Sequence, residues 1–196
     1  MIQPTYPELH DPGLRKFVYR RALETYGKFY NGSQVCLRIN PDVVAGETAN
    51  VATGGDLSKF GILLEDVKKA VAIAKENNIK IVGLHEHTGS GIADTGKVFQ
   101  SMQNLLGIIN PEDFPDLEFV DFGRGFKVPY EPGEVEIDYE KFGVKAVELF
   151  SEFCDRYGKK LKLYFEPGKF TVAELGIGET VTITYTYTVV ATDGGR

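Results

Sequence analysis

Three glycine-rich segments carry the polar side chains that could do chemistry in this chain of 196 residues. They read HEHTGSG (residues 85–91), DFGRGF (residues 121–126) and FEPGK (residues 165–169). Glycine backbone can approach an anion closely and offer its N–H groups, so these segments suit a phosphate. His85 and His87 add two imidazoles, and Glu166 adds a carboxylate beside a rigid Pro-Gly pair. Phosphate binding is one interpretation of the pattern, and a metal ion held by the histidines is another.

Four short apolar runs, rich in strand-forming residues, position these segments. They are QVCLRIN (residues 34–40), KIVGLH (80–85), LEFVDF (117–122) and LKLYFE (161–166). Between the runs, the apolar residues of 67–74, 98–109 and 142–157 recur with the three- and four-residue spacing of amphipathic helices. Strands that alternate with helices indicate parallel βα units. Because parallel strands all point the same way, we predict that the three polar segments meet at one rim of the sheet.

The two ends of the chain differ from this middle part. Residues 11–30 are predicted to form one helix, with Asp11 as its N-cap and Pro12 in its first turn. At the other end, residues 179–195 alternate apolar side chains with threonines, which predicts a Thr-rich β strand or hairpin with one drier face.

Composition limits the kinds of partner. The formal net charge of −6 argues against nucleic acid. No apolar run approaches the roughly 18 residues of a membrane span, and the N-terminus shows no secretory signal. Cys36 and Cys154 lie in apolar surroundings, so we expect buried free thiols and a cytoplasmic protein.

At the glycine-rich segments the chain resembles the alanine-racemase-like, fold type III enzymes that use pyridoxal 5′-phosphate, and within them the diaminopimelate decarboxylases. The matching segments are LRINPD, TGGDLSKFGI, GLHEHTGSGI, FVDFGRGFKVPY and LYFEPGKF, and together they span about residues 34–176. The resemblance implies an α/β fold, a (β/α) TIM-type barrel with the cofactor at the C-terminal rim of its strands. It also implies an amino-acid substrate and a decarboxylation that serves lysine biosynthesis.

The resemblance assigns roles to individual residues. His87 matches the histidine that stacks on the pyridine ring, and Ser90 matches a residue beside the phosphate. Gly123, Arg124 and Gly125 match the glycine loop that holds the phosphate through backbone N–H groups. Glu166 matches the carboxylate that pairs with the pyridine nitrogen. That carboxylate keeps the nitrogen protonated, so that the ring can accept electrons as CO₂ leaves.

Two further residues follow Glu166 directly. Gly168 matches a phosphate-loop position, and Lys169 matches a basic residue, commonly arginine, near the substrate carboxylate or the phosphate.

The chain departs from the family in three ways. Only 33 residues precede the first matching strand run, and none of the chain's lysines matches the family's Schiff-base lysine. The family's C-terminal β domain has no counterpart. Arg124 stands where the family usually has glycine, and its side chain could crowd the phosphate or add a positive charge to it.

We therefore expect a fragment whose isolated chain is inactive. The expected parts are an N-terminal helical segment (1–32), a partial cofactor-binding (β/α) barrel (33–178) and a C-terminal β segment (179–196). Open sheet edges and an apolar inner face predict self-association, as a homodimer or otherwise.

Two other functions stay open at this point. The chain could be a non-catalytic scaffold that binds pyridoxal phosphate or phosphate, or an empty barrel fragment. It could also be a metal-dependent hydrolase that uses His85 and His87 with Glu166 or Asp121. The only other histidine, His10, lies outside the strand pattern, so few ligands are available for a metal.

Overall fold

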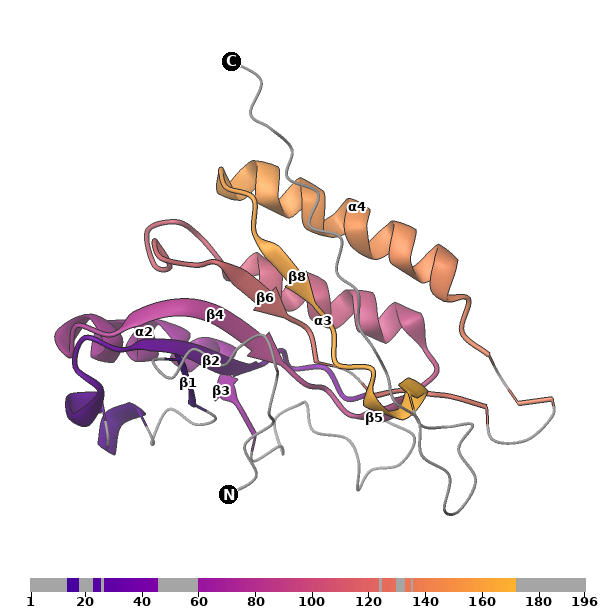
Figure 1. Cartoon of the computed structure of the whole chain (residues 1–196), viewed down its shortest axis with the longest axis horizontal. Coiled ribbons are helices and arrows are strands. Elements are labelled where there is room, and N and C mark those ends of the chain that lie inside the picture. Colours follow the sequence, from indigo (N-terminus) through magenta and orange to yellow (C-terminus); the bar gives the residue numbers. More distant parts are fainter. Residues whose placement is uncertain are drawn as a thin grey trace.

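The structure, a computed structural model, describes residues 14–17, 23–25, 27–45, 60–123, 125–129, 133–134 and 136–171. A parallel sheet forms its centre, with α2 and α3 behind the sheet and α4 along its upper edge in Figure 1. The strands of this sheet are β1 (Leu14–Phe17), β2 (Gln34–Asn40), β3 (Ile62–Leu63), β4 (Lys80–Glu86), β6 (Phe119–Asp121) and β8 (Lys162–Tyr164). Their order is β1-β2-β4-β6-β8, and β3 pairs with the end of β2.

Two short strands form a separate pair, β5 (Ser90–Ile92) with β7 (Gly125–Phe126). The helices are α2 (Val67–Glu76), α3 (Thr95–Gly107) and α4 (Tyr139–Tyr157). Three 3₁₀ turns complete the description: η1 (Gly27–Tyr30), η2 (Leu64–Asp66) and η3 (Gly168–Thr171).

The four predicted strand runs and the three predicted helices are confirmed. The predicted stripe of α2, which includes Val67 and Ala74, is buried against the sheet. The helix ends have the expected chemistry. Asp94 caps α3 by accepting the Gly96 N–H at 2.8 Å, and Asp138 caps α4 by accepting the Lys141 N–H at 2.9 Å.

The prediction of one helix over residues 11–30 is wrong, although residues 23–25 within that range are helical. Leu14–Phe17 form strand β1, which pairs in parallel with β2, and Gly27–Tyr30 form a 3₁₀ turn. Helical spacing in the sequence is a local signal, whereas β1 is held by backbone bonds to residues about twenty positions later in the chain. A strand therefore does precede the first predicted one. The predicted C-terminal β segment lies outside the described residues.

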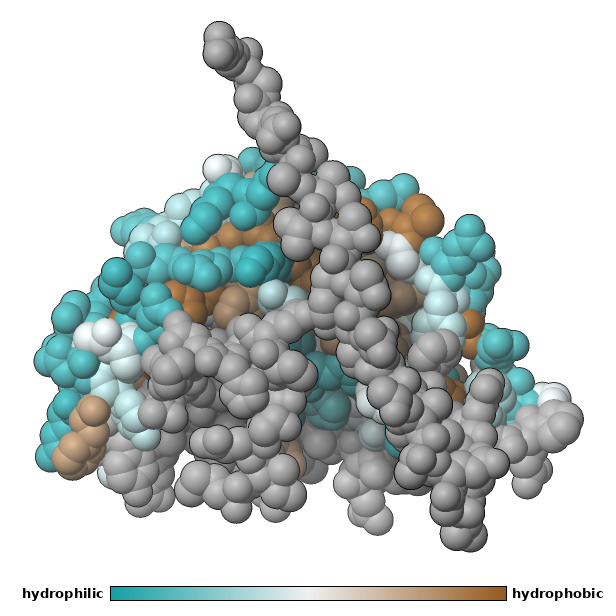
Figure 2. Space-filling model, in the orientation of Figure 1, coloured by the Kyte–Doolittle hydropathy of each residue, from teal (hydrophilic) through white to brown (hydrophobic). Residues whose placement is uncertain are grey.

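The two faces of the sheet have different surroundings. Val35, Leu37 and Val120 point into the main core, which also contains the buried faces of the helices. On the opposite face a smaller apolar cluster consists of Cys36, Val82, Phe119 and the partly buried Tyr164. Figure 2 shows hydrophobic side chains between hydrophilic ones over the sheet.

Both cysteines, Cys36 and Cys154, are buried free thiols, as the sequence predicted. None of the helices in the described residues is long and apolar enough to span a bilayer.

Gly83 on β4 makes room for Phe119 on β6. A Cβ added at Gly83 would overlap the Phe119 ring, which is only 4% exposed. Gly83→Ala is expected to lower the free energy of unfolding by about 1–3 kcal/mol, because the buried ring must shift. Gly143→Ala in α4 is the matched control. Apart from the backbone of its own helix, no atom of the described residues lies within 4 Å of its Cβ position, and the change should raise the free energy of unfolding by up to about 1 kcal/mol. Urea unfolding of both variants measures the difference, and a loss of equal size in both would contradict this account.

Candidate functional site

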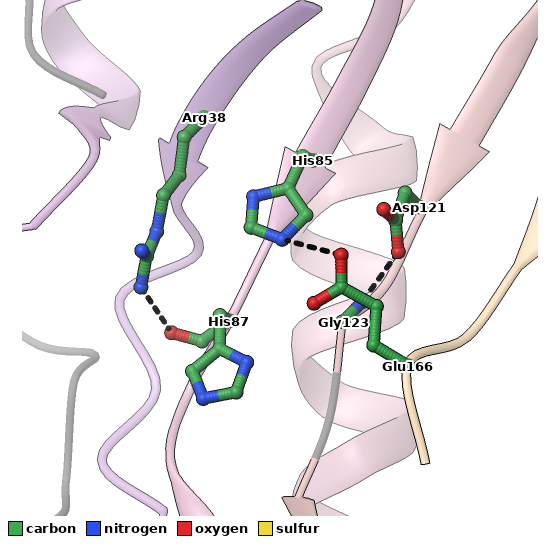
Figure 3. A network of polar contacts seen from close by, with 6 residues as sticks. All are labelled: Arg38, His85, His87, Asp121, Gly123 and Glu166. Carbon is green, nitrogen blue, oxygen red and sulfur yellow. Dashed lines mark hydrogen bonds and ion pairs between the residues drawn. The ribbon is translucent and has the colours of Figure 1, made fainter. Parts of the chain in front are cut away.

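A row of polar side chains crosses the sheet near the carboxyl ends of its strands. Arg38 on β2 is in register with His85 on β4, and His85 is in register with Asp121 on β6. Glu166, just after β8, reaches the same place (Figure 3). The meeting of strand ends at one rim, predicted from the alternation of strands and helices, is thus confirmed for β4, β6 and β8.

His85, Asp121 and Glu166 form a compact cluster. The His85 Nε2 lies 3.6 Å from the Glu166 Oε1, and one side-chain N or O atom from each residue lies within 4.8 Å of those of the other two. His85 and Asp121 are buried, while the Glu166 side chain is 21% exposed. The Asp121 Oδ1 accepts the Gly123 N–H at 2.9 Å, which fixes the direction of its carboxylate.

Backbone hydrogen bonds tie the three glycine-rich segments together. The Glu166 N–H donates to the Gly123 carbonyl at 2.8 Å, and the Gly125 N–H donates to the Gly89 carbonyl at 3.2 Å. The β5–β7 pair places Ser90 opposite Gly125. Turns that lie 35 to 80 residues apart in the chain are therefore one structural unit.

Gly123 and Gly125 are required by the packing of the chain itself. Gly123 has a φ of +57°, and a Cβ there would overlap the Glu86 carbonyl oxygen and lie 3.0 Å from the His87 Nδ1. A Cβ at Gly125 would overlap the Ser90 hydroxyl. The N–H groups of both glycines already donate within the chain, to Asp121 and Gly89. The two glycines thus permit close approach of the turns, and phosphate binding through either N–H would require its present bond to be shared or broken.

His87 lies just beyond the end of β4 and is half-buried. The Arg38 Nη2 donates to the His87 carbonyl at 3.4 Å, and the Arg38 guanidinium lies over the Phe60 ring at 5.1 Å from its centroid. Sequence reasoning missed Arg38. The available signal was a charged residue within the apolar run QVCLRIN, close to the carboxyl end of its strand.

The structure brings together most of the residues predicted for the site. His87, Ser90, Gly123, Gly125 and Glu166 lie on the three joined turns. The following residues, Gly168 and Lys169, lie in η3, where the Gly168 N–H donates to the Glu166 carbonyl at 2.8 Å. A Cβ at Gly168 would meet no atom of the described chain within 4 Å. Arg124 lies outside the described residues.

The metal interpretation needs a correction. It used both His85 and His87 as ligands, and their side chains would share a face only if the strand continued through both. The strand ends at Glu86, so His87 leaves the row. Within the described residues, the cluster suited to a metal is His85, Asp121 and Glu166.

Burial raises the pKa of the Glu166 carboxyl to about 7, from an ordinary value of 4.5. The cause is desolvation, which disfavours the ionised form. A cationic group close to Glu166 would lower this pKa and favour the ionised carboxylate.

Comparison with known proteins points to one family. The model described as "Pyridoxal-dependent decarboxylase, pyridoxal binding domain" matches residues 18–173. Diaminopimelate decarboxylase of Methanothermobacter thermautotrophicus is 32% identical over 147 residues, which cover 73% of this chain and 34% of that protein. The enzyme of Buchnera aphidicola subsp. Schizaphis graminum is 36% identical over 157 residues, which cover 79% and 36%. This chain spans about a third of the length of such relatives.

Solved structures agree with the sequence relatives. A crystal structure of diaminopimelate decarboxylase superposes with a TM-score of 0.72 at 28% identity, covering 87% of this chain and 40% of that one. The Helicobacter pylori enzyme complexed with L-lysine gives a TM-score of 0.62 at 25% identity, covering 79% and 39%. The resemblance based on the five matching segments is confirmed, as is a parallel α/β fold that corresponds to part of a barrel.

The raised pKa of Glu166 predicts a pH-dependent effect of Glu166→Gln. Stability from this group is fully present below about pH 4.5 and is lost as the pH rises through about 7, because the folded state disfavours the ionised carboxyl. The variant should match the parent near pH 4.5 and exceed its unfolding free energy near pH 8 by up to about 3 kcal/mol.

Urea unfolding at the two pH values tests this expectation. Glu118→Gln, an exposed carboxylate just before β6, controls for the loss of one negative charge. An advantage of Glu166→Gln that is the same at both pH values would show that burial of the ionised carboxyl is not its origin.

Proposed function

This chain belongs to the pyridoxal-dependent decarboxylases, and we propose that it forms the part of a diaminopimelate-type decarboxylase that holds the pyridine ring and phosphate of pyridoxal 5′-phosphate. The observation that carries the proposal is the union of the turns after β4, β6 and β8 (Figure 3). Those turns place an imidazole, a hydroxyl and a carboxyl within one unit. The proposed substrate is an amino acid of the diaminopimelate type, with lysine as the product.

The described residues fit this cofactor. The carboxyl of Glu166 is suited to accept the N–H of a protonated pyridine, and a cation there would offset the cost of burying its charge. The flat ring of His87 is suited to lie against the pyridine ring, and the bond from Arg38 to the His87 carbonyl holds that backbone in place. When bound, the pyridinium ring supplies a sink for the electron pair left on the α-carbon as CO₂ departs.

The phosphate would lie on the side of Ser90. The Ser90 hydroxyl lies close to Gly125, and no other atom of the described residues lies within 4 Å of the Cβ position of Gly168. Lys169 follows in η3 and is proposed to lie near the phosphate or the substrate carboxylate. Among the described residues no neighbour requires a glycine at position 168, which is consistent with a bound group close to its backbone.

Two further parts of the proposal concern the activity of this chain and its location. By itself, this chain is expected to bind the cofactor without decarboxylation, because no lysine matches the family's Schiff-base lysine. We also propose a reducing, cytoplasmic location, which the two free buried cysteines support.

Binding of pyridoxamine 5′-phosphate tests the cofactor site. This probe keeps the ring and the phosphate but lacks the aldehyde, so it cannot react with surface lysines. We expect saturable binding by isothermal titration, weakened about tenfold or more by Glu166→Gln, which removes a charge-assisted hydrogen bond. His87→Ala and Ser90→Ala should each weaken it, by loss of stacking and of a phosphate contact.

The control is Glu118→Gln, which should leave the affinity unchanged. Titration with inorganic phosphate separates the phosphate-binding part of the site from the part that binds the pyridine ring. If inorganic phosphate alone binds equally well and Glu166→Gln has no effect, the chain is a phosphate-binding scaffold rather than a cofactor site. No binding of either ligand would identify an empty barrel fragment.

Self-association is the remaining part of the proposal. Among the described strands, β1 and β8 end the sheet, and open edges favour pairing with a second chain. We expect sedimentation velocity to show a concentration-dependent shift from monomer to dimer or larger species. A single monomer species that persists at high concentration would contradict this part alone.

A further inference from the structure

We infer that His85, Asp121 and Glu166 form a binding site for a divalent transition-metal ion of the zinc type, and that this ion and the pyridine ring compete for Glu166. The site goes beyond the proposed cofactor function, in which His85 and Asp121 have no part. It shares only Glu166 with that function.

The donor atoms have the spacing that a small metal ion needs. Zinc binds histidine nitrogen and carboxylate oxygen at about 2.0–2.2 Å, so two ligands of a tetrahedral ion lie about 3.3 Å apart. The His85 Nε2 and the Glu166 Oε1 are 3.6 Å apart, and the third donor, from Asp121, lies within 4.8 Å of both. Small rotations of the two carboxylates would bring all three donor atoms within binding distance of one ion.

The strands and the hydrogen bond that position the three side chains resemble the surroundings of metal sites. The three ligands come from three neighbouring strands or strand ends, which fix their backbones. His85 and Asp121 are buried, and the Gly123 N–H donates to the Asp121 Oδ1 at 2.9 Å. Such an outer hydrogen bond orients a ligating carboxylate.

The ligand chemistry selects the class of ion. An imidazole with two carboxylates suits zinc and similar transition metals, whereas magnesium and calcium prefer shells made of oxygen alone. A dication also offsets the two carboxylates that the sheet brings close together. Since Glu166 remains partly exposed, the ion keeps an open side toward solvent.

The competition follows from geometry. A carboxylate oxygen of Glu166 that ligates a metal next to His85 is withdrawn from the pyridine nitrogen that the proposed function assigns to it. The metal also adds positive charge beside a protonated ring. Zinc and the cofactor should therefore exclude each other.

The first experiment titrates zinc chloride into the whole chain after treatment with a chelator, with no pyridoxal compound present. Isothermal titration should show saturable binding of one zinc ion per chain, and magnesium chloride should give none. His85→Ala, Asp121→Asn and Glu166→Gln should each weaken zinc binding by about tenfold or more. Asp121→Asn keeps the oxygen that accepts the Gly123 N–H, and circular dichroism confirms that each variant is folded.

His87→Ala is the matched control. It removes the neighbouring histidine, which lies outside the cluster, so zinc affinity should stay within about twofold of the parent while affinity for pyridoxamine 5′-phosphate falls. Zinc binding that survives all three cluster variants, or that His87→Ala weakens as much as His85→Ala does, would overturn the inference as adventitious binding.

The second experiment repeats the titration of pyridoxamine 5′-phosphate with zinc present at saturation. The apparent affinity for the probe should fall about tenfold or more. Unchanged affinity for the probe would overturn the competition. Because the first experiment contains no pyridoxal compound, failure of the metal site and failure of the proposed cofactor site are observed separately.

Discussion

The parallel register of β4, β6 and β8 is the constraint on which the rest of the site depends. Since all three strands run the same way, the chain leaves each of them at the same rim, and the residues that follow must share that space. The Glu166 N–H then bonds to the Gly123 carbonyl, which joins the turn after β8 to the turn after β6. Without this register, the sheet would not bring the three glycine-rich segments together.

Close approach of the turns imposes a second condition on the sequence. A side chain at Gly123 would collide with the backbone of Glu86, and a side chain at Gly125 would collide with Ser90. The glycines that suggested an anion-binding loop are therefore explained first by packing within the chain. Their N–H groups, which already donate to Asp121 and Gly89, are a weaker argument for a phosphate than the sequence pattern suggested.

The sequence predicted those parts of the fold whose signals are local. Alternating apolar runs identified β2, β4, β6 and β8, and helical spacing identified α2, α3 and α4, whereas the short strands β3, β5 and β7 were not predicted. Strand β1 was mistaken for part of a helix, since only its pairing with β2, far along the chain, makes Leu14–Phe17 a strand.

The candidate site shows the same division between local and distant signals. The sequence predicted which turns would meet, but its pairing of His85 with His87 was wrong. Residues two apart share a face only while the strand continues, and β4 ends at Glu86, between the two histidines. Arg38 escaped notice because its relation to His85 is one of register between strands rather than of spacing along the chain.

The free-energy cost of burying the ionised Glu166 carboxylate links the stability of the site to the ligands that it could bind. Burial disfavours its ionised form, so the folded chain without a ligand carries a penalty at neutral pH that a nearby cationic group would relieve. A protonated pyridine and a metal ion would relieve it in different ways, the first from the side of His87 and the second from the side of His85. Any ligand that binds only the folded state also stabilises it. Because burial makes the ionised Glu166 carboxylate costly, the stability of this fold depends on what binds at the rim of its sheet.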